Sequence, residues 1–273
     1  MFGAFSGDRF LRDLEASFIF RKVRGLPRLA PYACISLGVD CFPRAMLTKF
    51  GYKRKRADGE LSTPFDLAYH HPSVVIDMIR SDFVCAWDAR DLYIRHDGII
   101  MHRNGSMFNH ESDTDEKRRF FSEDGFRELR SRYERRAENF RRLVAEAEAK
   151  EGQIVFGNIG NTYPADLRDV LASRFPRLDF HILTINLLGR SSMYRDTLPN
   201  IEFGSEEASV NNFSFYSIRR PRDGYVWYDS NDFSTDAGRD FEAQIDDVFS
   251  RVMHKVRPSL ETPTSHFLLE ENA

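Results

Sequence analysis

The sequence has few cysteines and no long apolar run. Three cysteines occur among the 273 residues, without disulfide-framework spacing or the Cys-x-x-Cys pattern of a zinc site: Cys34, Cys41 and Cys85. No segment approaches the roughly 20 consecutive apolar residues of a membrane-spanning helix. We therefore expect free thiols in a reducing compartment, which predicts a cytoplasmic protein without a membrane span.

An excess of charge of one sign is also missing. The chain has 39 Lys and Arg against 42 Asp and Glu, a formal net charge of -3, so we expect neither nucleic acid nor an anionic membrane as a partner. Charges at Asp8, Arg9 and Arg12 interrupt the apolar stretch that a signal peptide needs. The chain is long enough to bury a core without a metal or disulfide.

The first half of the chain predicts one strand and several helices. Apolar residues at helical spacing predict an N-terminal helix over 8–23. A short apolar run, the turn residue Gly38 and a helical pattern follow, which predicts strand 33–37 and helix 41–50. Further along, the patterns predict a helix over 72–81, two short β-type stretches within 92–110 and a long Arg-rich amphipathic helix over 123–150.

The second half alternates between strand and helix patterns. Strands are predicted over 153–158, 179–188, 201–204, 213–220 and 225–229, and helices over 165–173 and 240–256. This alternation predicts an α/β domain with a layered, largely parallel central sheet flanked by helices. We expect one domain over 1–258 and a disordered tail over 259–273.

Three loops compete for a ligand site. In open α/β sheets ligands bind outside the carboxyl ends of the strands, which here precede the loops at 38–41, at 157–162 and after 185–186. Asn158 and Asn161 in the second loop can donate hydrogen bonds to an oxyanion or a polar substrate, although an ordinary turn is the favoured explanation of a Gly/Asn-rich loop. The loop matches neither glycine-rich phosphate-binding motif.

The position of Cys41 has two interpretations. A cysteine at a helix N-terminus can be a thiolate nucleophile, but a neighbouring carboxylate, here Asp40, raises a thiol pKa unless it caps the helix. The alternative is a small buried apolar residue. A nucleophilic cysteine also needs a base, and His102 and His110 lie on or beside the β-type stretches while Asp66 follows the Pro64-Phe65 turn, but no single histidine stands out from the residues alone. No metal-ligand pattern occurs, so we expect no metal and no cofactor.

The first half also resembles a known family. The motif residues are Ser36, Leu37, Gly38, Cys41, Leu47, Gly51, Pro64, Phe65, Asp66, Asp82 and Phe83, followed by "MFNHES" and "RYERRAENFRRLV". In this order they resemble a bacterial family of unknown function described as papain-like cysteine peptidases. The resemblance implies Cys41 as nucleophile, His110 as base and Asp66 as an orienting or substrate-facing carboxylate. It also implies an α+β papain-like fold as the alternative to the layered α/β sheet.

Three functional hypotheses follow. The first is a cysteine-dependent hydrolase or acyl transferase, in which backbone N–H groups from Gly38 through Asp40 to Cys41 stabilise the oxyanion. The second is a sugar- or nucleotide-sugar-handling transferase, because members of the family resemble proteins of surface-glycan assembly. The third is a non-catalytic binding protein. The expected substrate is a small molecule, a glycan or a peptide.

Overall fold

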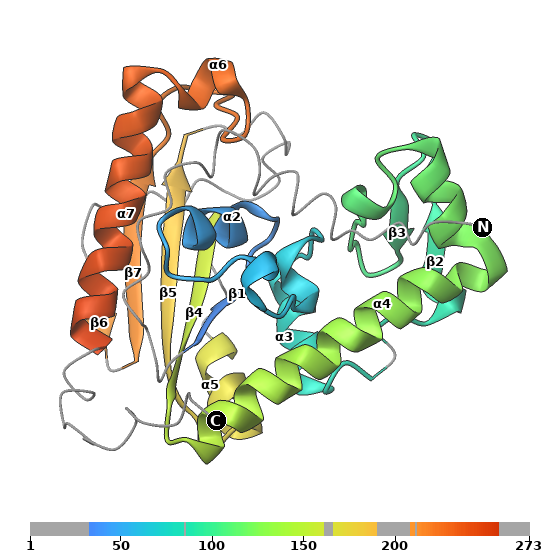
Figure 1. The fold of residues 1–273 in the computed structure, drawn as a ribbon, viewed down its shortest axis with the longest axis horizontal. Helices are drawn as coiled ribbons and strands as arrows, with labels where there is room; N and C mark the ends of the chain where they lie inside the picture. The colour runs from blue at the N-terminus through green and yellow to red at the C-terminus, as the bar shows by residue number, and fades with distance from the viewer. Residues whose placement is uncertain (1–32, 85, 161–165, 190–207, 211, 257–273) are drawn as a thin grey trace, which may run out of the picture.

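A mostly parallel sheet forms the centre of the protein (Figure 1). The computed structural model describes residues 33–84, 86–160, 166–189, 208–210 and 212–256. The sheet has the order β1-β4-β5-β7-β6. Its parallel strands are β1 (Ala33–Ser36), β4 (Gln153–Gly160), β5 (Asp179–Leu188) and β7 (Phe213–Arg219). The edge strand β6 (Ala208–Val210) is antiparallel to β7.

Helices cover both faces of this sheet because both faces of its strands are apolar. One apolar cluster includes Ile154 and Phe156 of β4, and the other includes Val155 and Ile159. The first cluster is completed by α3 (Pro72–Arg80), α4 (Asp115–Ala149) and α5 (Asp166–Arg174). The second is completed by α2 (Phe42–Lys49) and α7 (Asp236–Val256), and the short α6 (Ser230–Phe233) precedes α7.

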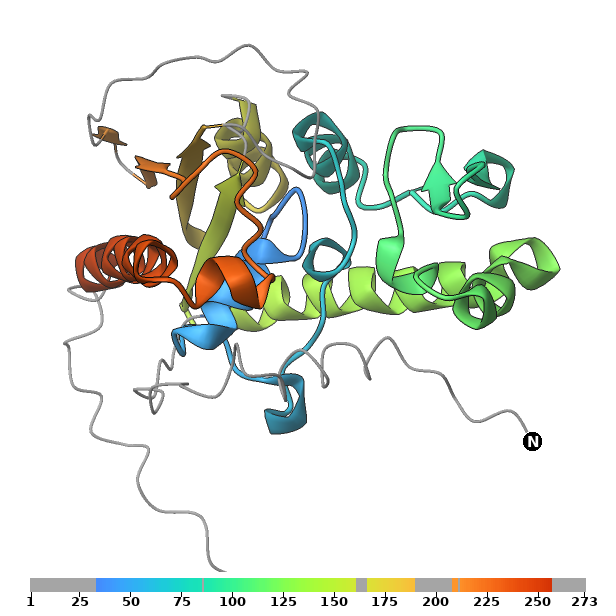
Figure 2. The ribbon, with the colours of Figure 1, turned by 90° about the horizontal axis from the view of Figure 1, so that it is seen from above.

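Helix α4 extends away from the sheet and carries a second group of short elements on its N-terminal half (Figures 1 and 2). These elements are β2 (Leu92–Ile94), β3 (Ile100–His102), η4 (Ala89–Asp91) and η5 (Asn109–Glu111), and the strands pair antiparallel. Closer to the sheet, η3 (Pro64–Asp66) also packs on α4, and η2 (Arg56–Asp58) precedes it. Residues Glu123 to Phe126 are non-helical and interrupt α4.

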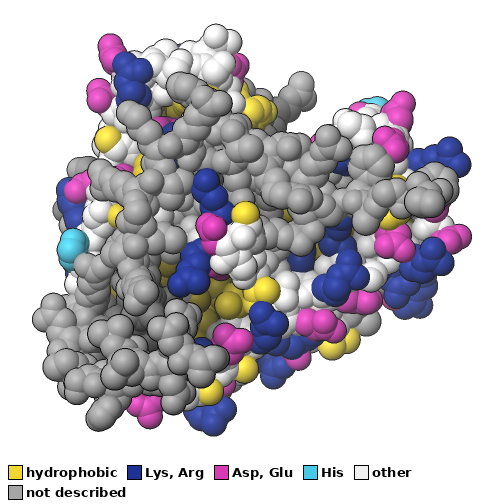
Figure 3. All heavy atoms as spheres, viewed as in Figure 1, with side chains coloured by type: hydrophobic (Ala, Val, Ile, Leu, Met, Phe, Trp, Pro, Cys, Tyr) yellow, Lys and Arg dark blue, Asp and Glu magenta, His cyan; other side chains and the backbone are white. Residues whose placement is uncertain are grey.

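Charged side chains of both signs alternate over the outer surface of α4 (Figure 3). Pairs such as Arg119–Glu123 and Arg142–Glu146 lie one helical turn apart. Arg132 and Arg136 differ from these because their side chains are turned inward, and only 12% and 5% of their surfaces are exposed. The sequence pattern predicted ion pairing on this helix but did not separate the two inward arginines from the rest.

The parallel sheet confirms the α/β prediction and not the α+β alternative. Most predicted elements are present, and the long helix begins earlier than predicted, at Asp115. The predicted strand over 225–229 is wrong, because these residues form turns that lead into α6. The predicted helix over 8–23, strand over 201–204 and tail over 259–273 lie outside the described residues.

Phe140 of α4 packs against both η3 and the central sheet, and this contact gives a test of the fold. Its ring lies 5.9 Å from that of Phe65 and 6.3 Å from that of Phe156 in the sheet, measured between centroids. Phe140→Ala should lower the free energy of unfolding by about 3–5 kcal/mol, because it leaves a cavity in a close-packed core. Denaturant unfolding measures this loss. The exposed Tyr93→Ala is the control, and an equal loss in both variants would contradict the assigned core.

Candidate functional site

The predicted turn after the first strand is present, and close packing requires its glycine. The Leu37 N–H donates to the Gly157 carbonyl oxygen at 2.9 Å, so pairing with β4 continues past the end of β1. A Cβ atom at Gly38 would lie 2.5 Å from both the Asp40 carbonyl oxygen and Pro43 Cγ. The turn therefore excludes a side chain at this position. It holds the next residues at the carboxyl edge, the edge where the parallel strands end.

The N-terminus of α2 is largely occupied by its own chain. An Asp40 carboxylate oxygen accepts the Phe42 N–H at 2.8 Å, as an N-terminal cap does. Pro43 follows and has no N–H to offer. Two of the N–H groups that an oxyanion or a thiolate would use are thus unavailable at the first turn of α2.

The Cys41 thiol is half-buried and is not prepared for nucleophilic attack. Burial is the main cause that raises its pKa, and the charge of Asp40 raises it further, against a smaller opposite effect of the Cys41 backbone N–H. No histidine is among the groups that act on this thiol within the described residues. Cys41 packs against the apolar cluster under α2 and α7, which agrees with the packing interpretation of this residue.

The three residues predicted as partners of Cys41 lie elsewhere. His110 belongs to η5, at the end of α4 that both ribbon views show far from α2 (Figures 1 and 2). Burial lowers its pKa, and the charges that act on it come from its own surroundings, led by Glu111. The His102 Nδ1 accepts the Asn104 N–H at 3.1 Å in the turn after β3. Asp66 is fully buried in η3 and accepts the Thr63 N–H at 2.8 Å.

Asp66 and His110 instead surround a buried group of charges on α4. The Glu111 carboxylate is completely buried and lies 3.4 Å from an Arg136 nitrogen and 3.6 Å from an Arg132 nitrogen. The Tyr133 hydroxyl donates to the same carboxylate at 3.4 Å. The charge of Asp66 also acts on Arg136. This group joins η3 and η5 to α4, which is a structural role that the sequence patterns did not predict.

The backbone of His70 contacts the Cys41 turn, whereas its imidazole is bonded elsewhere. Its N–H donates to the Val39 carbonyl oxygen at 3.1 Å. Its fully buried imidazole accepts the Ser106 hydroxyl at Nδ1, 2.8 Å away, and its Nε2–H points at the Pro64 carbonyl oxygen at 3.4 Å. Burial lowers the pKa of His70 to about 4, so the ring is neutral and held on both sides.

Two polar side chains are buried side by side toward the carboxyl edge. Asn158 of β4 is in register with Thr184 of β5, and both lie on the same sheet face as Phe156 and Ile182. Thr184 is 0% exposed, and its hydroxyl makes no hydrogen bond within the described residues. Asn158 was predicted as a substrate-binding residue and Thr184 was missed, because a threonine inside a strand pattern carries no motif. Asn161 lies outside the described residues.

An aromatic segment borders the same edge beside α2. Trp227 stacks on Phe42 with 4.8 Å between ring centroids, and Tyr228 meets Trp227 edge-on at 5.4 Å. The Asp232 carboxylate holds this segment by accepting the Val226 N–H at 2.7 Å. The Tyr228 ring is 47% exposed, whereas the Trp227 N–H is buried and has no acceptor within the described residues. Cys41 and Asp40 both act on the Tyr228 hydroxyl, so this ring lies beside the turn.

Comparison with known proteins and a search for other features add no assignment. No family model, no curated protein and no solved structure matches the chain. The described residues hold no cluster of three or more histidine, cysteine or acidic side chains arranged to ligate a metal. None of the helices in the described ranges has both the length and the apolar composition that crossing a bilayer requires. The family resemblance stays a prediction from the sequence.

The raised thiol pKa gives a direct test of Cys41. Iodoacetamide reacts with thiolates, so Cys41 should be alkylated slowly at pH 8 and ever faster as the pH rises past 10. Asp40→Asn keeps an oxygen to cap Phe42 but removes the charge, so it should speed this alkylation. Peptide mass mapping separates Cys41 from Cys34, whose pKa burial raises to about 12. Rapid labelling of Cys41 at pH 7 would instead support an activated nucleophile.

The lowered pKa of His70 predicts a loss of stability in acid. Between its ordinary pKa of 6.5 and about 4, the unfolded chain binds a proton that the folded chain does not. The free energy of unfolding should therefore fall as the pH falls through this window, by roughly 3 kcal/mol for this group. Urea unfolding at several pH values measures the slope. His70→Gln should be less stable at pH 7 and have a shallower slope, and equal slopes would contradict the assignment.

Proposed function

We propose that the protein is a transferase that binds a saccharide or a nucleotide sugar at the carboxyl edge of its sheet. The observation that carries the proposal is the completely buried Thr184 hydroxyl, which lacks a partner within the described residues and is in register with Asn158. Its strand belongs to a parallel sheet, and such sheets bind ligands at this edge. The resemblance to a family linked with glycan assembly supports the substrate class.

Thr184 is one of several described residues with a buried hydroxyl that lacks a partner, and its place beside Asn158 toward the carboxyl edge is what singles it out. Most buried polar side chains in folded proteins have a hydrogen-bond partner, and leaving one without a partner costs about 1–3 kcal/mol. A ligand rich in hydroxyl groups can both donate to Thr184 and accept from it. A sugar hydroxyl therefore fits this position better than an apolar ligand does.

The aromatic segment supports a ligand with a flat ring. Tyr228 is held edge-on by Trp227 and keeps nearly half of its surface exposed beside the Cys41 turn. An exposed aromatic ring of fixed orientation can stack a nucleobase or cover one face of a sugar, which contributes about 1–3 kcal/mol per stacked base in known complexes. This favours a nucleotide sugar over a free anion.

The cysteine-dependent mechanism has less support than this transfer reaction. A nucleophilic thiol needs a lowered pKa or a base within hydrogen-bond reach. Burial and the charge of Asp40 raise the pKa of the Cys41 thiol. The groups that act on His70, His102 and His110 do not include this thiol. Cysteine chemistry stays a prediction of the family resemblance, and the alkylation experiment above tests it.

Thermal unfolding with added ligand tests the proposal. Uridine- and guanosine-diphosphate hexoses at a concentration near 100 times their Kd should raise Tm by roughly 5 °C or more. Thr184→Val should abolish this shift, because it deletes the hydroxyl that the ligand would contact. Without ligand the same variant should be as stable as the wild type or more stable, since it removes a buried polar group that has no partner.

Thr48→Val is the matched control. Thr48 of α2 also has a buried hydroxyl without a partner within the described residues, and it lies in the last turn of α2, away from the Cys41 turn. This variant should keep the full ligand shift. A full shift in Thr184→Val, or no shift with any saccharide or nucleotide sugar, would remove the site from this edge.

A further inference from the structure

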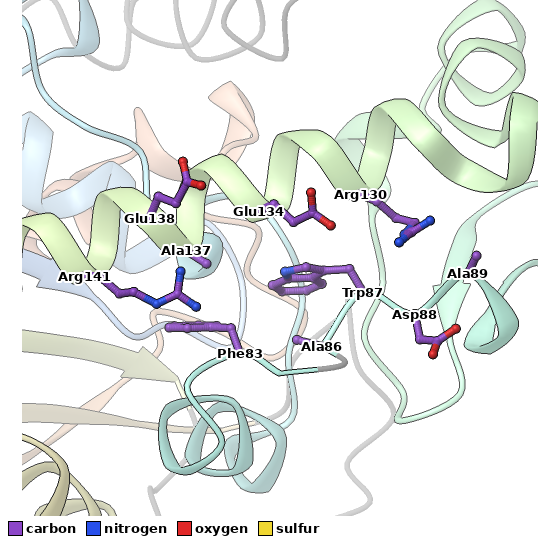
Figure 4. Close-up of a pocket in the computed structure, with 10 residues that line it drawn as sticks. All are labelled: Phe83, Ala86, Trp87, Asp88, Ala89, Arg130, Glu134, Ala137, Glu138 and Arg141. Carbon is purple, nitrogen blue, oxygen red and sulfur yellow. The ribbon is translucent and has the colours of Figure 1, made fainter.

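A cavity lies between α4 and the segment that follows α3 (Figure 4). It has a volume of about 470 Å³, within the usual range of small-molecule sites. Trp87 forms its centre, and Arg130 and Arg141 lie on either side of this indole along α4. On its other side Trp87 packs against Tyr133, with 4.8 Å between ring centroids, so the indole is fixed from behind.

Two donors in this cavity have no acceptor. The indole of Trp87 is 5% exposed, and its buried N–H makes no hydrogen bond within the described residues. The buried Nε of Arg130 has no hydrogen-bond partner there either, and its guanidinium forms no close ion pair within the described ranges, although it interacts electrostatically with Asp88 in the same cavity. An occupant of the cavity must therefore bring hydrogen-bond acceptors.

Two hydrogen-bond acceptors lie along α4 between Arg130 and Arg141 (Figure 4). Glu134 and Glu138 are one helical turn apart on α4, both are exposed to solvent at the mouth of the cavity, and in the described parts of the chain neither carboxylate has a hydrogen bond or an ion pair. The other two charged residues that line the cavity already form ion pairs. Asp88 pairs with Arg90 at 2.6 Å, and Arg141 pairs with Asp82 at 2.9 Å.

The mixture of charges excludes a strongly charged occupant. A phosphate or carboxylate would meet the repulsion of Glu134 and Glu138, and removing that charge from water without full pairing is costly. A polyamine would meet Arg130 and would leave the Trp87 N–H without an acceptor. A neutral ligand whose hydroxyl groups both donate and accept satisfies the carboxylates and the two donors together.

The walls also disfavour a peptide. Peptides bind extended along an open strand edge, as a helix in an apolar groove, or as polyproline on exposed aromatic rings. This cavity is lined by a helix and a loop, it has no strand among its lining residues, and its central ring is almost fully buried. We propose that the cavity beside Trp87 binds a neutral saccharide through hydrogen bonds to Trp87, Arg130, Glu134 and Glu138.

This inference does not depend on the carboxyl-edge site, since it uses none of the same residues. If the proposed transfer reaction is correct, the cavity is a separate contact for a sugar acceptor. If the transfer reaction is wrong, the cavity remains a saccharide site. The experiment therefore includes Thr184→Val, which should leave binding at Trp87 unchanged.

The two tryptophans of the chain provide the measurement. Each indole N–H gives one peak in a ¹H–¹⁵N spectrum of the full chain, and Trp87→Phe assigns them. Maltotriose, cellotriose, mannotriose and tri-N-acetylchitotriose are titrated separately. At least one should move the Trp87 peak in a saturable way, with the same affinity in Thr184→Val. Movement of the Trp227 peak reports the separate carboxyl-edge site.

Charge-neutral variants of the helix test the contacts. Glu134→Gln with Glu138→Gln should weaken that saccharide roughly tenfold, because hydrogen bonds to a charged acceptor are about twice as strong as neutral ones. Glu146→Gln, on the same helix but outside the cavity, should leave the affinity unchanged. An equal loss of affinity in the double variant and in Glu146→Gln would overturn the assignment of Glu134 and Glu138 as ligand contacts.

Other ligands define the remaining outcomes. Spermidine, inorganic phosphate and trialanine are titrated under the same conditions. Movement of the Trp87 peak by one of these and by none of the trisaccharides would overturn the proposal. So would a Trp87 peak that no trisaccharide moves, or a Trp87 response that is lost in Thr184→Val.

Discussion

The Glu111 carboxylate, buried against two arginines of α4, is the interaction that attaches η5 and its histidine to α4. A buried carboxylate is tolerated only beside compensating charge, and Arg132 and Arg136 supply it at 3.6 and 3.4 Å. Removing the Glu111 carboxylate, or the two arginines, would leave an uncompensated charge inside the protein. The carboxylate therefore fixes η5 on α4, and His110, the residue before it, is fixed with it.

That constraint separates the predicted triad. With η5 held on the N-terminal half of α4, His110 lies on the far side of the protein from α2, and Asp66 faces Arg136. Cys41 keeps a carboxylate neighbour and an apolar surrounding, both of which favour the protonated thiol. The family motif is present in the order of the residues, whereas the hydrogen bonds of a Cys-His pair are absent from the described part of the chain.

The sequence predicted the sheet better than it predicted the site, for physical reasons. Hydrophobic periodicity is a local property, so strand 179–188 and helix 72–81 could be predicted almost residue by residue. The segment at 225–229 is rich in aromatic residues, which are typical of strands, but Asp232 holds it as a turn by accepting the Val226 N–H. Such a contact between separated residues leaves no periodic signal. For the same reason the sequence could not distinguish the inward Arg136 from the outward Arg142, since both repeat at helical spacing.

Hydrogen-bond balance together with position distinguishes candidate ligand contacts from structural polar residues better than residue type does. The imidazole of His70 is chemically more reactive than a threonine hydroxyl or an indole. Both of its ring nitrogens nevertheless have partners, which makes it part of the core. Thr184 and Trp87 carry no catalytic motif, yet each buries a polar group without a partner within the described residues. A fold selected for stability alone would replace such groups with valine or phenylalanine, because the lone polar atom only adds a desolvation cost. Their retention at the carboxyl edge and in a cavity is what directs both proposals toward ligands with hydroxyl groups.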